Sequence, residues 1–172
     1  DKSGEAATLN NLGLIYHSLG HKQKSLRYYY EALTLRHQVG DKSGEAATLN
    51  NLGLAYHSLG DKQKALGYYE EALPLSRQVG DKSGEAAILN NLGGVYSSLG
   101  EKNKALKYYE DALILRRFVG DKPGEATTLY NMGSVYHSLS DKQKALGYYE
   151  EALPLQRQVG DKSGEATTLN NI

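Results

Sequence analysis

Apolar and small residues recur at steps of three and four through most of the chain, with polar and charged residues between them. In residues 41–60 these positions fall on one stripe of an α-helix, and they are Ala46, Leu49, Leu52, Gly53, Tyr56 and Leu59. A second stripe follows with the same spacing, made of Ala65, Leu66, Tyr69, Ala72, Leu73 and Leu75. The pattern predicts two amphipathic helices joined by a short turn, the second running from about Lys62 to Val79.

The residues at the ends of these stripes favour the same boundaries. Asp41 is a suitable N-cap for the first helix, and Glu45 lies close to its positive N-terminus. Gly60 and Gly80 supply left-handed stops after the two helices. Pro123 occupies the matching first turn of a later copy, where the missing amide hydrogen loses no partner. We therefore expect each copy of this phrase to begin a helix.

The whole pattern repeats every 40 residues without an insertion. The phrase DKSGEA, or DKPGEA in one copy, begins at Asp1, Asp41, Asp81, Asp121 and Asp161. Residues 41–80 and 121–160 differ at only eight positions, so one stacking geometry must serve every unit. No strand alternation of the kind found in propeller blades is present. We expect a single array over residues 1–172, consisting of repeats 1–40, 41–80, 81–120 and 121–160 and a partial fifth, 161–172, which is the first half of a first helix.

The segment NLGLAYHSLGDKQKALGYYEEAL resembles a tetratricopeptide repeat. The resemblance is carried by Leu49, Leu52, Gly53, Tyr56, Gly60, Ala65, Tyr69 and Ala72 and covers the whole chain. The usual unit has about 34 residues, and the longer variant is similar to repeats of kinesin light chains, of Pins-type adaptors and of bacterial arrays attached to CHAT or signalling domains. The resemblance implies an all-α, right-handed superhelical solenoid of antiparallel helix pairs.

Two columns of tyrosine are part of this pattern. They are Tyr16, Tyr56, Tyr96 and Tyr136 on the first helices, and Tyr29, Tyr69, Tyr109 and Tyr149 on the second helices. Glycine and alanine at neighbouring positions would allow the paired helices to approach closely. We expect these tyrosines to pack in the core with a hydrogen-bonded hydroxyl and not to contact a cofactor.

Stacked pairs of this kind line an inner, concave surface with their first helices, which makes the outward columns of those helices a candidate peptide-binding groove. The candidate residues are Asn10, Asn11, Leu14, His17, Asn50, Asn51, Leu54, His57, Asn90, Asn91, Tyr130, Asn131 and His137. The resemblance implies peptide contact for Asn11, Asn51, Asn91 and Asn131 in particular. An amide both donates and accepts, so these columns suit the backbone of an extended peptide.

An alternative is that the asparagines bond to the neighbouring repeat and have only a structural role. Tetratricopeptide grooves that bind the acidic C-terminus of a chaperone have lysine and arginine beside the asparagines. The corresponding columns of this chain contain neither residue, so we expect no such carboxylate clamp.

Charge and composition narrow the partners. Lysine plus arginine and aspartate plus glutamate number 20 each, so no net field favours nucleic acid or an anionic membrane. Cysteine is absent, and no apolar run approaches the ~20 residues that span a bilayer. We expect a cytoplasmic protein whose partner is another protein or a peptide, with no nucleic-acid and no membrane partner.

The sequence offers no catalytic or metal-binding constellation. His17 and His21 have the spacing of a helical zinc site, but Gly20 interrupts the helix between them. His57 and His137 stand in different repeats, too far apart for one ion, and the histidines are expected to be exposed on the groove wall. The same residues recur in every unit, whereas catalysis needs unlike groups in one place. We predict a protein that is not an enzyme and has no metal and no cofactor.

Three hypotheses on function remain open. The first is a scaffold that binds a peptide or partner segment in the groove. The second is a regulatory or sensor arm of a larger enzyme, such as a CHAT protease-like protein or a signalling ATPase. The third is self-assembly into a homo-oligomer by end-to-end stacking or swapping of the terminal repeats, because Leu169 and Ile172 have no second helix to cover them.

Overall fold

The computed structural model describes all 172 residues, which form nine α-helices and no strand. The helices are α1 (Lys2–Ser18), α2 (Lys22–Val39), α3 (Lys42–Ser58), α4 (Lys62–Gln78), α5 (Lys82–Ser98), α6 (Lys102–Val119), α7 (Lys122–Ser138), α8 (Lys142–Val159) and α9 (Lys162–Asn171). The chain divides at the first turn of α5 into two compact units. They are the N-terminal unit, Asp1–Gly84, and the C-terminal unit, Glu85–Ile172. The expected all-α fold class is confirmed, and α4 ends one residue before the predicted Val79.

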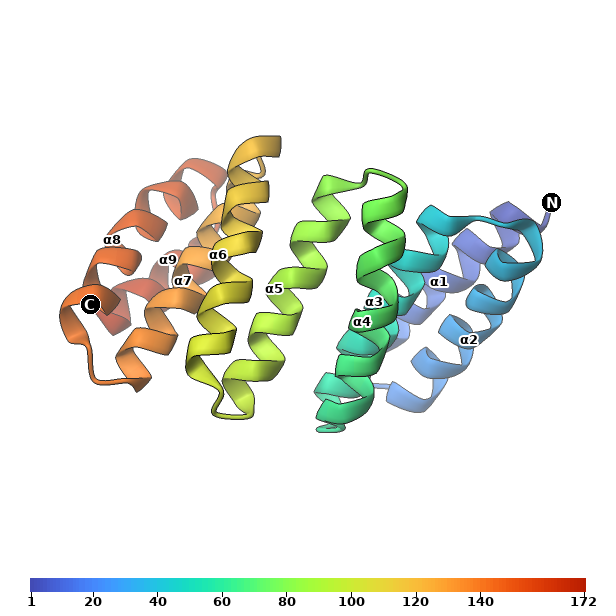
Figure 1. Cartoon of the computed structure of the whole chain (residues 1–172), viewed down its shortest axis with the longest axis horizontal. Helices are drawn as coiled ribbons and strands as arrows, with labels where there is room; N and C mark the ends of the chain where they lie inside the picture. Colours follow the sequence, from blue (N-terminus) through green and yellow to red (C-terminus); the bar gives the residue numbers. More distant parts are fainter. The chain divides into compact units, whose positions relative to one another are not determined.

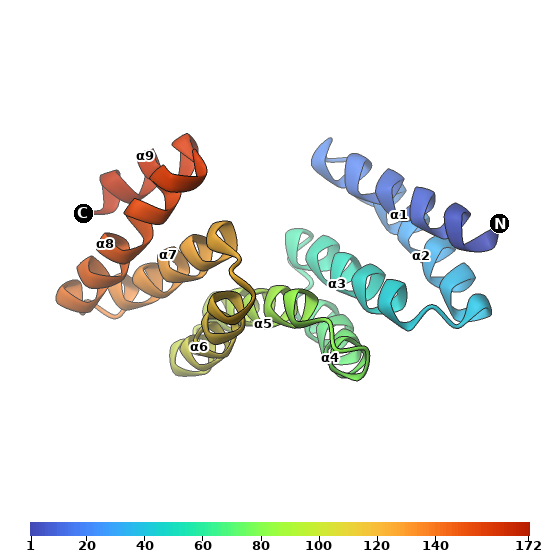
Figure 2. The ribbon, with the colours of Figure 1, turned by 90° about the horizontal axis from the view of Figure 1, so that it is seen from above.

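Within each unit, helices that follow one another in the chain pack as antiparallel pairs (Figure 1). In the N-terminal unit α1 packs on α2 and α3 on α4, while α2 also contacts α3 and joins the two repeats. Direct contact between α1 and α3 places the first helices of two successive repeats side by side (Figure 2). In the C-terminal unit α7 lies between α6 and α8, and α8 packs on α9.

The expected end signals are present at the helix termini. The Asp41 side chain accepts a hydrogen bond from the Gly44 amide at 2.9 Å and so caps α3. Gly60 has φ of +83° and Gly40 has φ of +70°, the left-handed conformation that ends a helix with little strain in glycine. Ser140 takes the place of the loop glycine and is the one other residue type with positive φ.

A glycine on each first helix receives a tyrosine ring from the second helix of the same repeat. A Cβ atom on Gly53 would lie 2.5 Å from Cε1 of Tyr69, and Tyr69 is fully buried. The same arrangement joins Gly13 to Tyr29, Gly93 to Tyr109 and Gly133 to Tyr149. The predicted close approach of the paired helices is therefore confirmed, and the absence of a side chain at these glycines makes room for the ring.

The predicted hydrogen bond at these tyrosine hydroxyls is not general. The Tyr149 hydroxyl donates to Ser134 Oγ at 3.3 Å, but the buried Tyr69 hydroxyl has no partner, so the expectation is wrong for Tyr69. Burial raises the pKa of Tyr69, and it raises the pKa of Tyr109 to about 12. The ring accounts for the position of these residues, because its apolar area fills the core whether or not the hydroxyl is bonded.

The first-helix tyrosines stack on the second helix of their own repeat. Tyr56 lies on Tyr68 with ring centroids 5.4 Å apart, and the Tyr30 hydroxyl shares hydrogen bonds with both hydroxyls, at 2.8 Å and 2.6 Å. Parallel stacks of the same kind join Tyr16 to Tyr28, Tyr96 to Tyr108 and Tyr136 to Tyr148. These stacks fix the two helices of a repeat against each other at the end opposite the DKSGEA phrase.

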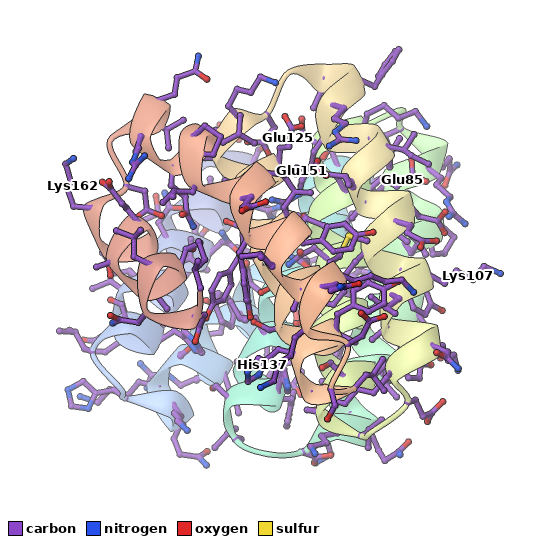
Figure 3. All side chains as sticks on the ribbon, turned by 90° about the vertical axis from the view of Figure 1, so that its left-hand side faces the viewer. Glu85, Lys107, Glu125, His137, Glu151 and Lys162 are labelled. Carbon is purple, nitrogen blue, oxygen red and sulfur yellow. The ribbon has the colours of Figure 1, made fainter.

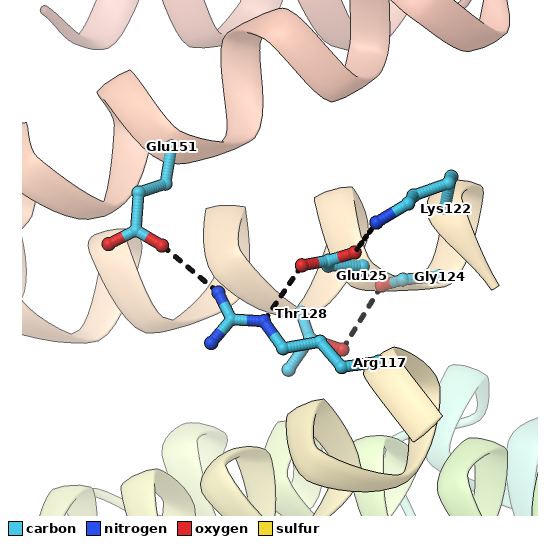
Figure 4. Close-up of polar contacts among 6 residues, drawn as sticks. All are labelled: Arg117, Lys122, Gly124, Glu125, Thr128 and Glu151. Carbon is cyan, nitrogen blue, oxygen red and sulfur yellow. Dashed lines mark hydrogen bonds and ion pairs between the residues drawn. The ribbon is translucent and has the colours of Figure 1, made fainter. Parts of the chain in front are cut away.

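The glutamate of the repeated DKSGEA phrase ties successive repeats together. In the C-terminal unit Glu125 accepts hydrogen bonds from Lys122 Nζ and from Arg117 Nε, both at 2.8 Å (Figure 4). Arg117 also reaches Glu151 at 3.1 Å, so it links α6 to both α7 and α8. Burial raises the pKa of Glu125, but the hydrogen bonds from Lys122 and Arg117 outweigh burial and leave that pKa below its ordinary value.

Candidate functional site

The predicted binding residues lie on a surface that we call the first-helix face. It consists of the candidate residues of α1 and α3 in the N-terminal unit and, separately, of α5 and α7 in the C-terminal unit. Leu14 and Leu54 are 40% and 36% exposed, respectively, and Asn11 is also exposed. Asn50, Asn51, Asn90, Asn91, Tyr130 and Asn131 are half-buried, and Asn10 is buried. The face therefore combines partly accessible amides with exposed leucine side chains.

Asparagines of successive repeats are hydrogen-bonded to each other within each unit. Asn51 Nδ2 donates to Asn10 Oδ1 at 3.0 Å, and the Thr48 hydroxyl donates to the same oxygen at 3.3 Å. In the C-terminal unit Asn131 Nδ2 donates to Asn90 Oδ1 at 3.3 Å. The structural role considered for the asparagines is therefore present for these pairs. Sequence reasoning raised this alternative but could not tell which amide would donate.

The inter-repeat bonds leave part of each donating amide unused. An asparagine side chain has two N–H donors and an oxygen acceptor, and the bond to Asn10 engages one donor of Asn51. Asn51 is half-buried and not sealed between the helices, so solvent reaches part of this residue. The bond to the preceding repeat also fixes the orientation of the amide. Asn51 and Asn131 thus present oriented polar groups on the first-helix face.

Tyr130 replaces asparagine in its column and has different neighbours. Its ring centroid lies 5.6 Å from that of Tyr149, and its hydroxyl accepts a hydrogen bond from Asn171 Nδ2 at 3.1 Å. Asn171 is in α9, so this bond joins the first helices of two successive repeats. Tyr130 as a whole is half-buried.

The histidines of the face differ in exposure. His137 is exposed at the far end of α7 from Glu125 (Figure 3), as expected. His17 and His57 are half-buried, so the expectation that all three are exposed is wrong for these two. Burial lowers the pKa of His57, and the nearby Lys62 lowers it further, which keeps the imidazole neutral at pH 7. The neutral ring adds no charge to the face.

A cleft of about 250 Å³ opens in the C-terminal unit beside Tyr130. Its lining residues are Thr127, Tyr130, Gln156, Asp161, Ser163, Gly164 and Thr167. Sequence reasoning missed this cleft, although it carried a signal: Gln156 occupies the repeat position that holds Arg36 and Arg116 in other repeats. A side chain shorter than the arginine of these two repeats leaves room beside the next first helix.

None of the nine helices combines the length and the apolar character needed to cross a bilayer. The sequence pattern of the tetratricopeptide repeat family matches residues 4–78 and again residues 84–158. The chain belongs to the tetratricopeptide repeat family. The two matches cover most of each of the four 40-residue repeats, so the resemblance noted in the sequence is confirmed.

Solved structures with a similar fold include three from different kinds of protein. BtubC from P. vanneervenii is 26% identical, with a TM-score of 0.80 over 93% of this chain. The Rap conjugation gene regulator of the plasmid pLS20, in complex with the Phr* peptide, is 20% identical, with a TM-score of 0.89 over 98%. The signal transduction ATPase of Pyrococcus horikoshii with a tetratricopeptide repeat sensor is 20% identical, with a TM-score of 0.85 over 99%.

The chain is shorter than the three proteins to which it is similar. The chain spans 66% of BtubC, 46% of the Rap regulator and 27% of the signal transduction ATPase. No curated protein sequence matches the chain. The likeness to the Rap regulator and to the ATPase establishes a shared fold.

Proposed function

We propose that this chain is a non-catalytic interaction scaffold that binds an extended peptide or partner segment along its first-helix face. The observation that carries the proposal is the pair of oriented, half-buried amides, Asn51 and Asn131, each held by the preceding repeat with hydrogen-bonding capacity to spare. An extended backbone offers alternating N–H and C=O groups that such amides can bond. The exposed Leu14 and Leu54 supply apolar contact beside them.

The Rap regulator supports this reading, because it has the same fold and its structure contains the Phr* peptide. We place a peptide on the first-helix face of each unit separately. In the N-terminal unit it contacts Asn11, Asn50 and Asn51, with His17 and His57 at the edge. In the C-terminal unit it contacts Asn91, Tyr130 and Asn131, with His137 at the edge. Asn10 and Asn90 act behind the face, since their oxygens accept from the amide of the next repeat. The partner chemistry is a polypeptide, bound in the cytoplasm without a cofactor.

A peptide-display selection against the whole chain, followed by binding measurements on variants, tests the proposal. We expect Asn51→Ala to weaken a selected peptide by about 1 kcal/mol, roughly fivefold, for each hydrogen bond lost, while helicity by circular dichroism stays unchanged. Asn91→Ala and Asn131→Ala are expected to act in the same direction.

Asn10→Ala is the matched control, because it removes the acceptor that orients the Asn51 amide but keeps the amide itself. A larger loss of affinity for Asn51→Ala than for Asn10→Ala supports a binding amide. Equal losses, or unfolding of the Asn51→Ala variant, would assign the asparagines to structure alone. A selection that yields no specific peptide would count against the scaffold itself.

A second candidate function is the sensor arm of a larger enzyme, favoured by the likeness to the ATPase whose tetratricopeptide repeats form a sensor. The two candidates share the same binding face and differ in what the chain is joined to. Sequencing the gene on both sides of this segment separates them: a protease or ATPase domain in the same reading frame supports the sensor arm.

A further inference from the structure

The cleft beside Tyr130 lies at the junction of two repeats and is lined by Gln156. The residue at this position differs between the repeats. Arg36, Ser76, Arg116 and Gln156 are equivalent residues near the end of each second helix. Arg36 and Arg116 are only 7% and 8% exposed, and each guanidinium lies against the glycine of the next DKSGEA phrase. In two of the four repeats, this junction therefore holds a buried guanidinium group.

The charge of that guanidinium is met by the N-cap aspartate of the next helix. Arg116 Nη1 lies 3.9 Å from Asp121 Oδ2. Burial lowers the pKa of Arg116 and the carboxylate of Asp121 raises it. The two neighbouring cations, Arg117 and Lys122, both pair with Glu125. Arg116 is therefore the cation that faces the Asp121 carboxylate.

The junction between α8 and α9 has the same surroundings and lacks the guanidinium. Arg157 and Lys162 pair with Glu165 at 2.7 Å and 3.2 Å, as their counterparts pair with Glu125. Asp161 uses Oδ1 to accept from the Gly164 amide at 2.9 Å, while the nearby Arg157 and Lys162 pair with Glu165. The arrangement of charges that holds Arg116 is thus repeated around an open cleft of about 250 Å³.

Gln156 leaves a polar group unsatisfied at this cleft. The residue is 3% exposed, it lines the cleft, and its Oε1 is buried without a hydrogen-bond partner. Ser76 at the equivalent position is satisfied, because its hydroxyl donates to the Asp81 carbonyl at 2.9 Å. An unpaired buried acceptor is costly, and a ligand that brings N–H donors would relieve that cost.

We infer that this cleft is the subsite for an arginine side chain of the bound partner segment. Its guanidinium enters the cleft beside the place that Arg36 and Arg116 fill elsewhere, where Gln156 Nε2 lies against Gly164. There it donates to Asp161 and, as the Gln156 amide turns toward the cleft, to Gln156 Oε1. It lies against the half-buried ring of Tyr130, which favours a cation on its face. The volume is below the about 300–1,000 Å³ of sites for whole small molecules and suits one side chain. The inference rests on the proposed function, because the arginine belongs to the segment that the first-helix face binds.

Titration of the whole 172-residue, ¹⁵N-labelled chain with N-acetyl-arginine amide tests the subsite directly. We expect saturable shifts of the Ser163, Gly164 and Thr167 amides. N-acetyl-citrulline amide has nearly the same shape without the charge and is expected to bind at least about tenfold more weakly. Equal shifts with the two probes, or no saturable shift with arginine amide, would overturn the inference.

Gln156→Arg provides the decisive variant, because arginine is native to this position in two other repeats and the fold accommodates it. Its own guanidinium fills the cleft, so the response to arginine amide is lost while the other amide resonances keep their positions. Gln143→Arg adds the same charge at an exposed position of α8 and leaves the response intact. An unchanged response in Gln156→Arg would contradict the assignment.

The arginine inference and the scaffold proposal fail in different ways. Selected peptides that bind the chain but show no preference for arginine, with wild-type affinity in Gln156→Arg, leave the scaffold standing and remove the subsite. If the chain responds to arginine amide but no peptide can be selected against it, the cleft binds arginine and the scaffold proposal fails.

Discussion

At the scale of single residues, the glycines of this chain divide by what surrounds them. Gly53 on α3 faces the buried ring of Tyr69, whereas Gly67 on α4 has open space where a Cβ would lie. We expect Gly53→Ala to destabilise the fold by about 1–3 kcal/mol through overpacking. Gly67→Ala is expected to stabilise it by about 0.5–1 kcal/mol, because alanine favours the helix. Urea unfolding followed by circular dichroism measures both, and a stabilising Gly53→Ala would contradict the packing described here.

The same scale shows where prediction from sequence stopped. The columns of Asn51 and Tyr69 could be assigned to the face and the core because a strict period fixes which side of a helix each residue occupies. The period does not fix what a side chain bonds to, so the donation from Asn51 to Asn10 and the unpaired hydroxyl of Tyr69 were visible only in the structure. The cleft at Gln156 was missed for a related reason. It arises where one residue departs from the repeat, whereas the prediction used the positions that the repeats share.

At the scale of elements, the N-caps of the second helices differ between repeats. Asp61 accepts a hydrogen bond from the Lys64 amide at 3.1 Å, whereas Glu101 at the equivalent position of α6 makes no capping bond. Glutamate carries the same charge as aspartate on a longer side chain. The two helices therefore differ in the capping hydrogen bond but have the same charge at their N-termini. Helix boundaries were predictable to within a residue because these caps and the left-handed glycines are local signals.

This difference predicts opposite effects of exchanging the two acids. Glu101→Asp should add the missing bond and stabilise α6 by about 1 kcal/mol, and Asp61→Glu should remove one and destabilise α4 by a similar amount. Amide hydrogen exchange at Lys104 and Lys64, the third residues of the two helices, reports the local effect. Slower exchange at Lys104 in Glu101→Asp is the expected result, and unchanged exchange at both sites would show that the cap makes no contribution.

At the scale of the whole molecule, each of the two units has its own buried residues. Leu52 is fully buried in a cluster with Leu26, Tyr29 and Ala55, all within the N-terminal unit. Met132 occupies the position equivalent to Leu92 in the preceding repeat and is 1% exposed in the C-terminal unit. In arrays of repeats, stability is close to a sum of contributions from each repeat and its neighbours. A change in one core is therefore expected to act mainly within its own unit.

A reciprocal pair of core substitutions tests this expectation. Leu52→Ala and Met132→Ala should each cost about 2–5 kcal/mol, because each leaves a cavity in a packed site. In Leu52→Ala the amides of α1 and α3 should exchange faster with solvent while those of α7 and α8 keep their protection, and Met132→Ala should give the reverse. The argument depends on the contrast between the two variants, since a general loss of stability would accelerate exchange in all helices of both. That uniform outcome would mean that the two units unfold as one cooperative body.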